Sequence, residues 1–157
     1  MEINMKHNTT TEKNTKKITQ MMEKQILAKA DIDQVLSDHQ EDLIAMSLSE
    51  YLDTLLKKYH ANKKAILART FIDLSYGYQI FNGTKQNPQR DYLLQIAFAF
   101  PLDVKETKHL LYYGNAASLY PRVKRDAYLM YALHNGFSLY EVNDYLKKNT
   151  LEPFQEE

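Results

Sequence analysis

The stretch NKKAILARTFIDLSYGYQIFNG, from Asn62 to Gly83, decides how the rest of the chain is interpreted. It predicts two short helices joined by a tight turn. Asn62 precedes the first helix, Asp73 is a favourable N-cap for the second, and Gly83 suits the left-handed conformation that ends it. Two helices joined by a turn of about four residues match the DNA-binding helix-turn-helix, whose second helix enters the major groove. The stretch therefore predicts a helix-turn-helix unit.

Length and composition narrow the class of protein. At 157 residues the chain fits one domain, or one domain with a helical extension. A hydrophobic content of 44% supports a core, while four glycines and four prolines are too few for a turn-rich all-β fold. No apolar run approaches the roughly 20 residues of a membrane span, no secretory signal is found, and cysteine is absent. We therefore expect an all-α, cytoplasmic protein that does not bind membranes.

Charge is unevenly distributed, although the net formal charge is zero. Seven acidic residues and no Lys or Arg lie between Asp31 and Asp53. Seven Lys or Arg residues lie between Lys57 and Arg90, with Asp73 as the single acid among them. Zero net charge counts against a strongly electrostatic nucleic-acid binder. The two blocks are solvated helix faces, or they pair within the fold, or they form a basic face modulated by an acidic arm.

Hydrophobic periodicity and helix-capping signals divide the chain into segments. A capping box, in which an N-cap residue is followed three positions later by Glu, starts a helix after each of Ser47, Asp103 and Ser138. Five helices with short connections around the two-helix stretch predict a compact all-α domain. The expected segments are a disordered tail (1–17), a helical arm (18–46), the helix-turn-helix domain (47–114), a C-terminal helical hairpin (115–149) and a tail (150–157).

The sequence contains no pattern typical of catalysis or metal binding. The five histidines are isolated, without the H-x-x-x-H or H-E-x-x-H spacing of a metal site. Dinucleotide-binding, P-loop and nucleophile-elbow motifs are also absent from the sequence. The twelve tyrosines are spread along the chain from Tyr51 onward, which favours amphipathic packing over base stacking. We therefore expect a protein that is not an enzyme and that needs no metal and no cofactor.

Several short motifs within the five-helix segment occur together in one known family. They are Leu67-Ala68, Ile80, Asn82-Gly83, Pro88 and the run LLQIAFAF before Leu102-Asp103-Val104. With these motifs the segment resembles the lambda-repressor-like (Xre-type) helix-turn-helix family. The whole chain is similar to Xre-type regulators of Gram-positive bacteria that carry C-terminal helices. The resemblance implies a five-helix lambda-repressor-like domain that binds double-stranded DNA as a homodimer.

The resemblance also implies which residues read bases. They lie at the start and on the outer face of the third helix of the domain: Leu74, Ser75, Tyr78 and Gln79. Gln79 can bond adenine with two hydrogen bonds, and hydroxyl side chains can bond bases or phosphates. These positions would carry the sequence preference.

Phosphate contacts are expected from basic residues around that helix. Lys63 matches the family's phosphate-contacting position at the start of the second helix. Three more basic residues lie near it in the chain and would neutralise phosphates: Lys64, Lys85 and Arg90. Such contacts position a protein on DNA without specifying sequence.

Four residues depart from the family pattern, one of them Phe81, which replaces a frequently acidic residue. Asp73 adds a negative charge facing the phosphates, and Leu74 can contact only a thymine methyl group. Gly77 replaces an aliphatic residue expected to bury against the second helix, at a cost of about 1 kcal/mol in helix propensity. Two functions therefore stay open. The chain is a sequence-specific DNA-binding transcriptional regulator, or it is a non-catalytic helical module that binds a protein partner through its N-terminal arm or its C-terminal hairpin.

Overall fold

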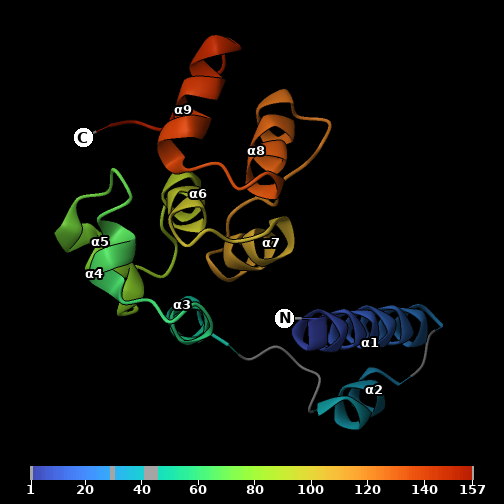
Figure 1. The fold of residues 1–157 in the computed structure, drawn as a ribbon. Helices are drawn as coiled ribbons and strands as arrows, with labels where there is room; N and C mark the ends of the chain where they lie inside the picture. The colour runs from blue at the N-terminus through green and yellow to red at the C-terminus, as the bar shows by residue number, and fades with distance from the viewer. Residues whose placement is uncertain (1, 29–30, 41–45, 157) are drawn as a thin grey trace. The chain divides into compact units, whose positions relative to one another are not determined.

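The computed structural model describes residues 2–28, 31–40 and 46–156 (Figure 1). Every helix or strand assigned in these residues is an α-helix, which confirms the all-α class. The chain separates into two compact units, Met1–Ala45 and Met46–Glu157.

The first unit is a pair of helices. α1 spans Glu2–Leu27, and α2, which spans Ile32–Asp38, packs against it. Asp31 caps α2 by accepting a backbone N–H at 3.0 Å. Between the helices, Nε2 of His39 lies 2.9 Å from Oε1 of Gln25. The Asp31 cap is local to α2, whereas the His39–Gln25 contact joins the C-terminal end of α2 to α1.

The helix of residues 2–27 differs from the disorder expected for residues 1–17. The low apolar content of that segment suggested disorder, but the chain has no glycine before Gly77 and no proline before Pro88 to interrupt a helix. Lys, Glu and Met in this segment are good helix formers. Residues 41–45, at the end of the predicted arm, lie outside the described residues, and they include two of the seven acids of the acidic block.

The second unit holds the remaining helices, which are joined by short connections. They are α3 (Leu48–Lys58), α4 (Lys63–Leu67), α5 (Leu74–Phe81), α6 (Arg90–Ala99), α7 (Val104–Tyr113), α8 (Lys124–His134) and α9 (Leu139–Lys148). In Figure 1, α6 and α7 lie between α3, α4 and α5 on one side and α8 and α9 on the other. The segments expected at 47–114 and 115–149 therefore belong to one compact unit.

The predicted capping boxes are all present. The side chain of Ser47 accepts the N–H of Glu50 at 3.2 Å, while Glu50 accepts the N–H of Ser47 at 3.3 Å. The same reciprocal bonds start α7 and α9. Each box satisfies two backbone donors that a helix start otherwise leaves unpaired. Local signals therefore determine where these three helices begin.

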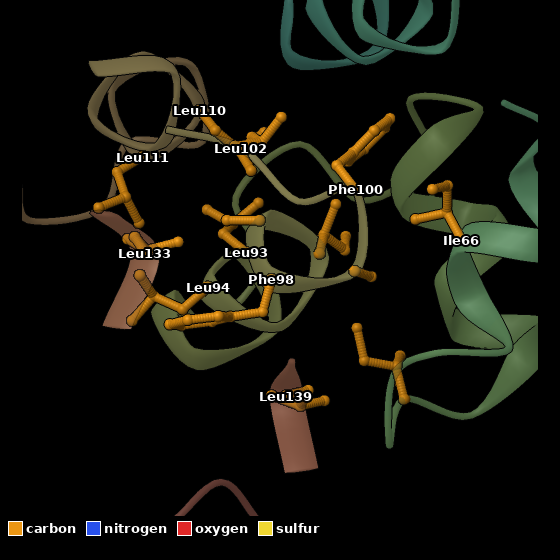
Figure 2. Packing of buried hydrophobic residues seen from close by; sticks show 14 of the residues in the cluster. Ile66, Leu93, Leu94, Phe98, Phe100, Leu102, Leu110, Leu111, Leu133 and Leu139 are labelled. Atoms are coloured by element: carbon orange, nitrogen blue, oxygen red, sulfur yellow. The ribbon is translucent and has the colours of Figure 1, made fainter. Parts of the chain in front are cut away.

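α6 runs through the centre of the second unit. Every residue from Leu93 to Phe100 is buried. Figure 2 shows Leu94 of α6 in one cluster with Leu110 of α7 and Leu133 of α8. A helix that is almost entirely apolar is typical of the middle of a core. The helices on both sides of α6 thus bury their apolar faces against it.

The α6–α7 and α8–α9 hairpins are two versions of one structure, displaced by 35 residues. α7 and α9 begin and end 35 residues apart, and a capping box starts each. The connection within each hairpin is closed by the same backbone hydrogen bond, donated by Leu102 in the first and by Phe137 in the second. The residue after each C-cap has a positive φ, 55° at Asn115 and 58° at Thr150. The local backbone geometry is therefore repeated.

Burial is also repeated at several positions of the two hairpins. The equivalent pairs that are buried in both are Leu94 and Leu129, Ala97 and Ala132, Phe98 and Leu133, Thr107 and Val142, Leu111 and Leu146, and Leu119 and Phe154. The contacts between the hairpins are reciprocal, because α6 packs on α9 and α7 packs on α8. Reciprocal contacts are those of an interface with two-fold symmetry. The hairpins therefore face each other about a local two-fold axis.

Two ion pairs cross between the starts of α6 and α8. Arg90 donates to both carboxylate oxygens of Asp126 at 3.0 and 2.9 Å, and Arg125 donates to both oxygens of Asp91 at 3.0 and 3.1 Å. Each arginine also donates Nε–H to a carbonyl 27 residues further along the chain, at 2.9 Å in both hairpins. Each hairpin supplies the arginine that binds the other's aspartate. We call these four side chains the crossed Arg–Asp pairs.

The residues after α9 are anchored to the core. Asn143, itself buried, accepts the N–H of Phe154 at 2.6 Å and donates to its carbonyl at 3.1 Å. The Phe154 ring is 1% exposed, and the guanidinium carbon of Arg125 lies 5.0 Å from its centre. The expected tail at 150–157 is therefore part of the packed unit as far as Phe154.

Candidate nucleic-acid interface

The α4–α5 pair occupies the stretch in which two helices were predicted. Asn62 caps α4, because its side chain accepts the N–H of Ala65 at 2.8 Å. Asp73 caps α5 in the same way, through the N–H of Tyr76 at 3.1 Å. Gly83, with a φ of 90°, follows the end of α5. The capping predictions for Asp73 and Gly83 are confirmed, and the structure adds the cap at Asn62.

The turn between α4 and α5 is held by α6. Gln95, a buried α6 residue, accepts the backbone N–H of Phe71 at 2.9 Å. Arg69 reaches from the same turn to the carbonyl of Ala99 at 3.1 Å. A buried backbone N–H without a partner costs about 1–3 kcal/mol, so the Gln95 contact fixes the turn. Sequence reasoning missed this role, although Gln95 is the one polar residue in the run LLQIAFAF.

The inner face of α5 is fixed against α3 and the core. Ile80 and Phe81 are fully buried. The hydroxyl of Ser49 in α3 donates to the carbonyl of Phe81 at 2.7 Å, which satisfies a carbonyl at the end of α5. The position and rotation of α5 are therefore determined by both packing and hydrogen bonding.

Gly77 has a packing role that differs from the one expected. A Cβ atom built on Gly77 would lie 2.5 Å from Cδ2 and 2.8 Å from Cδ1 of Leu67 in α4. Leu67 itself is buried. The apolar volume expected from an aliphatic residue on α5 is thus supplied by α4, and the glycine lets the two helices approach closely.

The outer face of α5 carries the four predicted base-reading residues. Ser75, Tyr78 and Gln79 lie one, four and five positions after Leu74, so all four residues lie along one side of the helix. Leu74 is 45% exposed and Ser75 is also exposed, whereas Tyr78 and Gln79 are half-buried. Tyr78 also packs against the edge of the core. The structure therefore brings the four side chains together on one surface of the unit.

The predicted phosphate-binding lysines lie on α4 and in the loop after α5. Lys63 is half-buried and Lys64 is exposed, both in the first turn of α4. Lys85 is exposed, and its Nζ lies 5.7 Å from the centre of the Tyr76 ring. Its backbone N–H also donates to the carbonyl of Gln79 at 3.0 Å. The loop that carries Lys85 is therefore attached to α5.

Arg90, the fourth predicted phosphate contact, has a different position. Its guanidinium makes four hydrogen bonds, to Asp126 and to the carbonyls of Ala117 and Ser118. Asp126 is buried, so releasing the arginine would leave a buried carboxylate without its partner. Arg90 thus connects α6 to α8 and is not placed for DNA. The prediction relied on proximity in the chain and lacked the long-range partner.

A polar cluster joins α3 to α7. Glu106 accepts hydrogen bonds from Nζ of Lys58 at 2.8 Å and from the hydroxyl of Tyr59 at 2.5 Å. Burial alone would raise the pKa of Glu106, but these bonds and a backbone N–H lower it below its ordinary value. Burial and the neighbouring Glu106 raise the pKa of both Tyr51 and Tyr59. The cluster therefore holds an ionised carboxylate between neutral tyrosines.

Among residues 2–28, 31–40 and 46–156, no group of three His, Cys, Asp or Glu side chains is arranged to hold a metal ion. No helix in the described part of the chain is long and apolar enough to cross a membrane. Comparison with known proteins gives no match to a protein-family model, a curated protein or a solved structure.

Proposed function

We infer that the chain is a non-catalytic, sequence-specific DNA-binding regulator of transcription, with a lambda-repressor-like arrangement of α3 to α7. The observation that carries this proposal is the surface of α5. One side of this helix presents Leu74, Ser75, Tyr78 and Gln79, while its other side is fixed to the core. A short helix held rigidly with a polar outer face is suited to the major groove.

The fixed position of α5 supports base reading. Direct readout needs side chains held at the spacing of base edges, which a mobile helix does not provide. Contacts to Gln95, Ser49 and Leu67 restrain the turn, the end and the middle of the α4–α5 pair, respectively. A rigid helix therefore presents its outer side chains in one arrangement.

Each outer residue fits a particular contact. Gln79 would donate and accept at an adenine edge, the hydroxyls of Ser75 and Tyr78 would bond a base or a phosphate, and Leu74 would contact a thymine methyl group. Lys63, Lys64 and Lys85 would contact phosphates on either side of the groove. In a homodimer, two copies of α5 would lie about one DNA turn apart, ~34 Å.

An interaction module without DNA binding is the second candidate. It is supported by Leu74, a large apolar side chain at the start of α5 that is 45% exposed. The exposed carboxylate of Asp73 beside it would repel phosphates. Such a surface is also compatible with docking of a protein partner.

Binding to DNA separates the two candidates. Selection from a pool of random double-stranded DNA, with promoter DNA from the protein's own locus included, should enrich one sequence pattern under low salt. Fluorescence anisotropy then measures affinity for that pattern and for a scrambled duplex. Failure to enrich any sequence and to bind either duplex at low salt would reject the DNA proposal and favour the interaction module.

Three single variants test the docking of α5. Gln79→Ala should relax the preference at one base position, by about 1–3 kcal/mol. Lys63→Ala should weaken binding to all sequences alike, because a phosphate contact carries no sequence information. Lys124→Ala, which removes an exposed charge at the start of α8, is the matched control and should change neither property. Equal effects of Lys63→Ala and Lys124→Ala would contradict the proposed orientation.

A further inference from the structure

The two equivalent hairpins differ at the positions that other helices cover in the first one. α3 packs on α7 and α4 packs on α6, whereas within residues 46–156 no further helix packs in the equivalent way on α8 and α9. In the first hairpin, the positions concerned are fully buried: Leu93, Ile96, Leu102 and Leu110. Their equivalents 35 residues later are all aromatic and at least partly exposed: Tyr128, Tyr131, Phe137 and Tyr145. We call these four side chains the aromatic face.

The aromatic face is a continuous cluster. Ring centres of Tyr131 and Phe137 lie 6.0 Å apart, those of Phe137 and Tyr145 5.6 Å apart, and those of Tyr131 and Tyr145 6.0 Å apart. Tyr131 is 54% exposed. Tyrosine and phenylalanine are enriched at the centres of protein–protein interfaces. This part of α8 and α9 therefore has the composition of an interface centre.

The first hairpin shows how a helix lies on this kind of face. The ring of Tyr51, near the start of α3, packs on the ring of Tyr113 at the end of α7, with the ring centres 4.7 Å apart and the planes tilted by 37°. Lys58, at the end of α3, pairs at 2.8 Å with Glu106 in the first turn of α7. The covering helix is therefore antiparallel to α7, with a lysine at its end bound to a glutamate at the start of α7.

On one side of α9, a stripe of three residues contains both a glutamate and a lysine. Glu141, Tyr145 and Lys148 are spaced by four and three residues, so they line one side of the helix, and the two charged side chains are exposed. Glu141 is the equivalent of Glu106. An antiparallel copy of the same helix would place its own Lys148 opposite Glu141, and its Glu141 opposite Lys148. The stripe is thus complementary to itself.

We propose that the aromatic face is a docking surface for a second copy of this chain, in which the two α9 helices lie antiparallel. Tyr131, Phe137 and Tyr145 of the two copies form the centre of the interface. Two symmetric ion pairs between Glu141 and Lys148 flank it. The contact is isologous, as in most dimers with two-fold symmetry.

Charge exchange tests the proposal in the full chain. Analytical ultracentrifugation should show a concentration-dependent equilibrium between monomer and dimer. Lys148→Glu and Glu141→Lys should each raise the dimer dissociation constant about tenfold or more, because each replaces two attractive pairs by two repulsive ones. An equimolar mixture of the two variants should associate nearly as tightly as the unmodified chain, since the mixed dimer restores both pairs.

The control is Lys147→Glu, which changes the same charge one residue away, outside the stripe, and removes only an exposed ion pair with Glu156 of the same chain. It should leave the dissociation constant unchanged, and helical circular dichroism should be the same for all variants. A chain that is monomeric at every concentration overturns the proposal. So does a dimer that Lys148→Glu and Lys147→Glu weaken equally, or a mixture that does not recover. DNA binding is measured separately, so this test does not depend on the proposed function.

Discussion

The α6–α7 and α8–α9 hairpins share one backbone plan, but their surroundings differ. Both begin with an Arg-Asp pair, both contain a capping box, and both bury equivalent side chains at the contact between them. Where α3 covers the first hairpin, its side chains are aliphatic or pair with α3. Phe100 and Tyr113 on that covered face become Asn135 and Lys148 in the second hairpin, and both of these are exposed. The comparison shows that burial beneath another helix, more than backbone geometry, determines which side chain occupies each repeated position.

The largest expected effect separates equivalent positions of α6 and α8. Ile96→Ala removes a fully buried side chain and should lower the free energy of unfolding by about 2–5 kcal/mol. Tyr131→Ala, at the equivalent but half-exposed position, should lower it by about 1 kcal/mol or less. Urea unfolding of dilute protein measures both. Similar losses for the two variants would mean that the hairpins are covered to the same extent.

The crossed Arg–Asp pairs should also be unequal. The Asp126 side chain is 7% exposed and also accepts the N–H of Tyr120, whereas the Asp91 side chain is 41% exposed. Asp126→Asn should therefore lower the free energy of unfolding by about 2–4 kcal/mol. Asp91→Asn should lower it by about 1 kcal/mol, because solvent screens the exposed pair. Thermal or urea unfolding gives the two values. A larger loss for Asp91→Asn would contradict this difference.

The ends of α7 and α9 provide a smaller contrast. A Cβ atom on Gly114 would lie 2.4 Å from Cδ1 of the buried Leu93, so Gly114→Ala should cost about 1–3 kcal/mol. At the equivalent position, Asn149 accepts a hydrogen bond from Tyr128 at 3.1 Å. Asn149→Ala should cost about 1 kcal/mol. Equilibrium unfolding measures both losses of stability. A Gly114→Ala variant as stable as the unmodified chain would show that the core beneath α7 is loosely packed.

Glu106, the capping glutamate of α7, should contribute to the pH dependence of stability. The pKa of Glu106 is lowered in the folded state, so its contribution to stability is present above its ordinary value of 4.5 and is lost as pH falls below it. When the pH falls, the Glu106→Gln variant should therefore lose about 1 kcal/mol less unfolding free energy than the unmodified chain. Unfolding free energies near neutral pH and near pH 3 test this. Glu141→Gln, which removes the capping carboxylate of α9, is the control. If Glu106→Gln lost as much stability on acidification as the unmodified chain, the role assigned to Glu106 would be refuted.

Local chemistry determined what could be predicted from the sequence. The N-caps at Asn62 and Asp73 and the capping boxes depend on residues within three positions, so a sequence pattern reveals them. The exposure of the outer face of α5 likewise followed from helical spacing. These elements needed no knowledge of distant parts of the chain.

Long-range partners determined what could not be predicted. Arg90 pairs with a residue 36 positions away, and Gln95 binds a backbone group 24 positions away. The role of Gly77 depends on Leu67 in another helix. The repeat itself was a detectable signal, because identical residues recur 35 positions apart at Arg90 and Arg125. The intervening substitutions, which follow coverage by α3 and α4, obscured it.

The central claim is that the outer face of α5 binds DNA, and the salt dependence of binding tests it most directly. Anisotropy of the full chain on its selected duplex should be measured at about 50 and 200 mM salt. Three lysines per copy, in a dimer, would make about six phosphate contacts, and the affinity should fall roughly 10³-fold. An unchanged affinity, or no binding at the lower salt, would contradict the account.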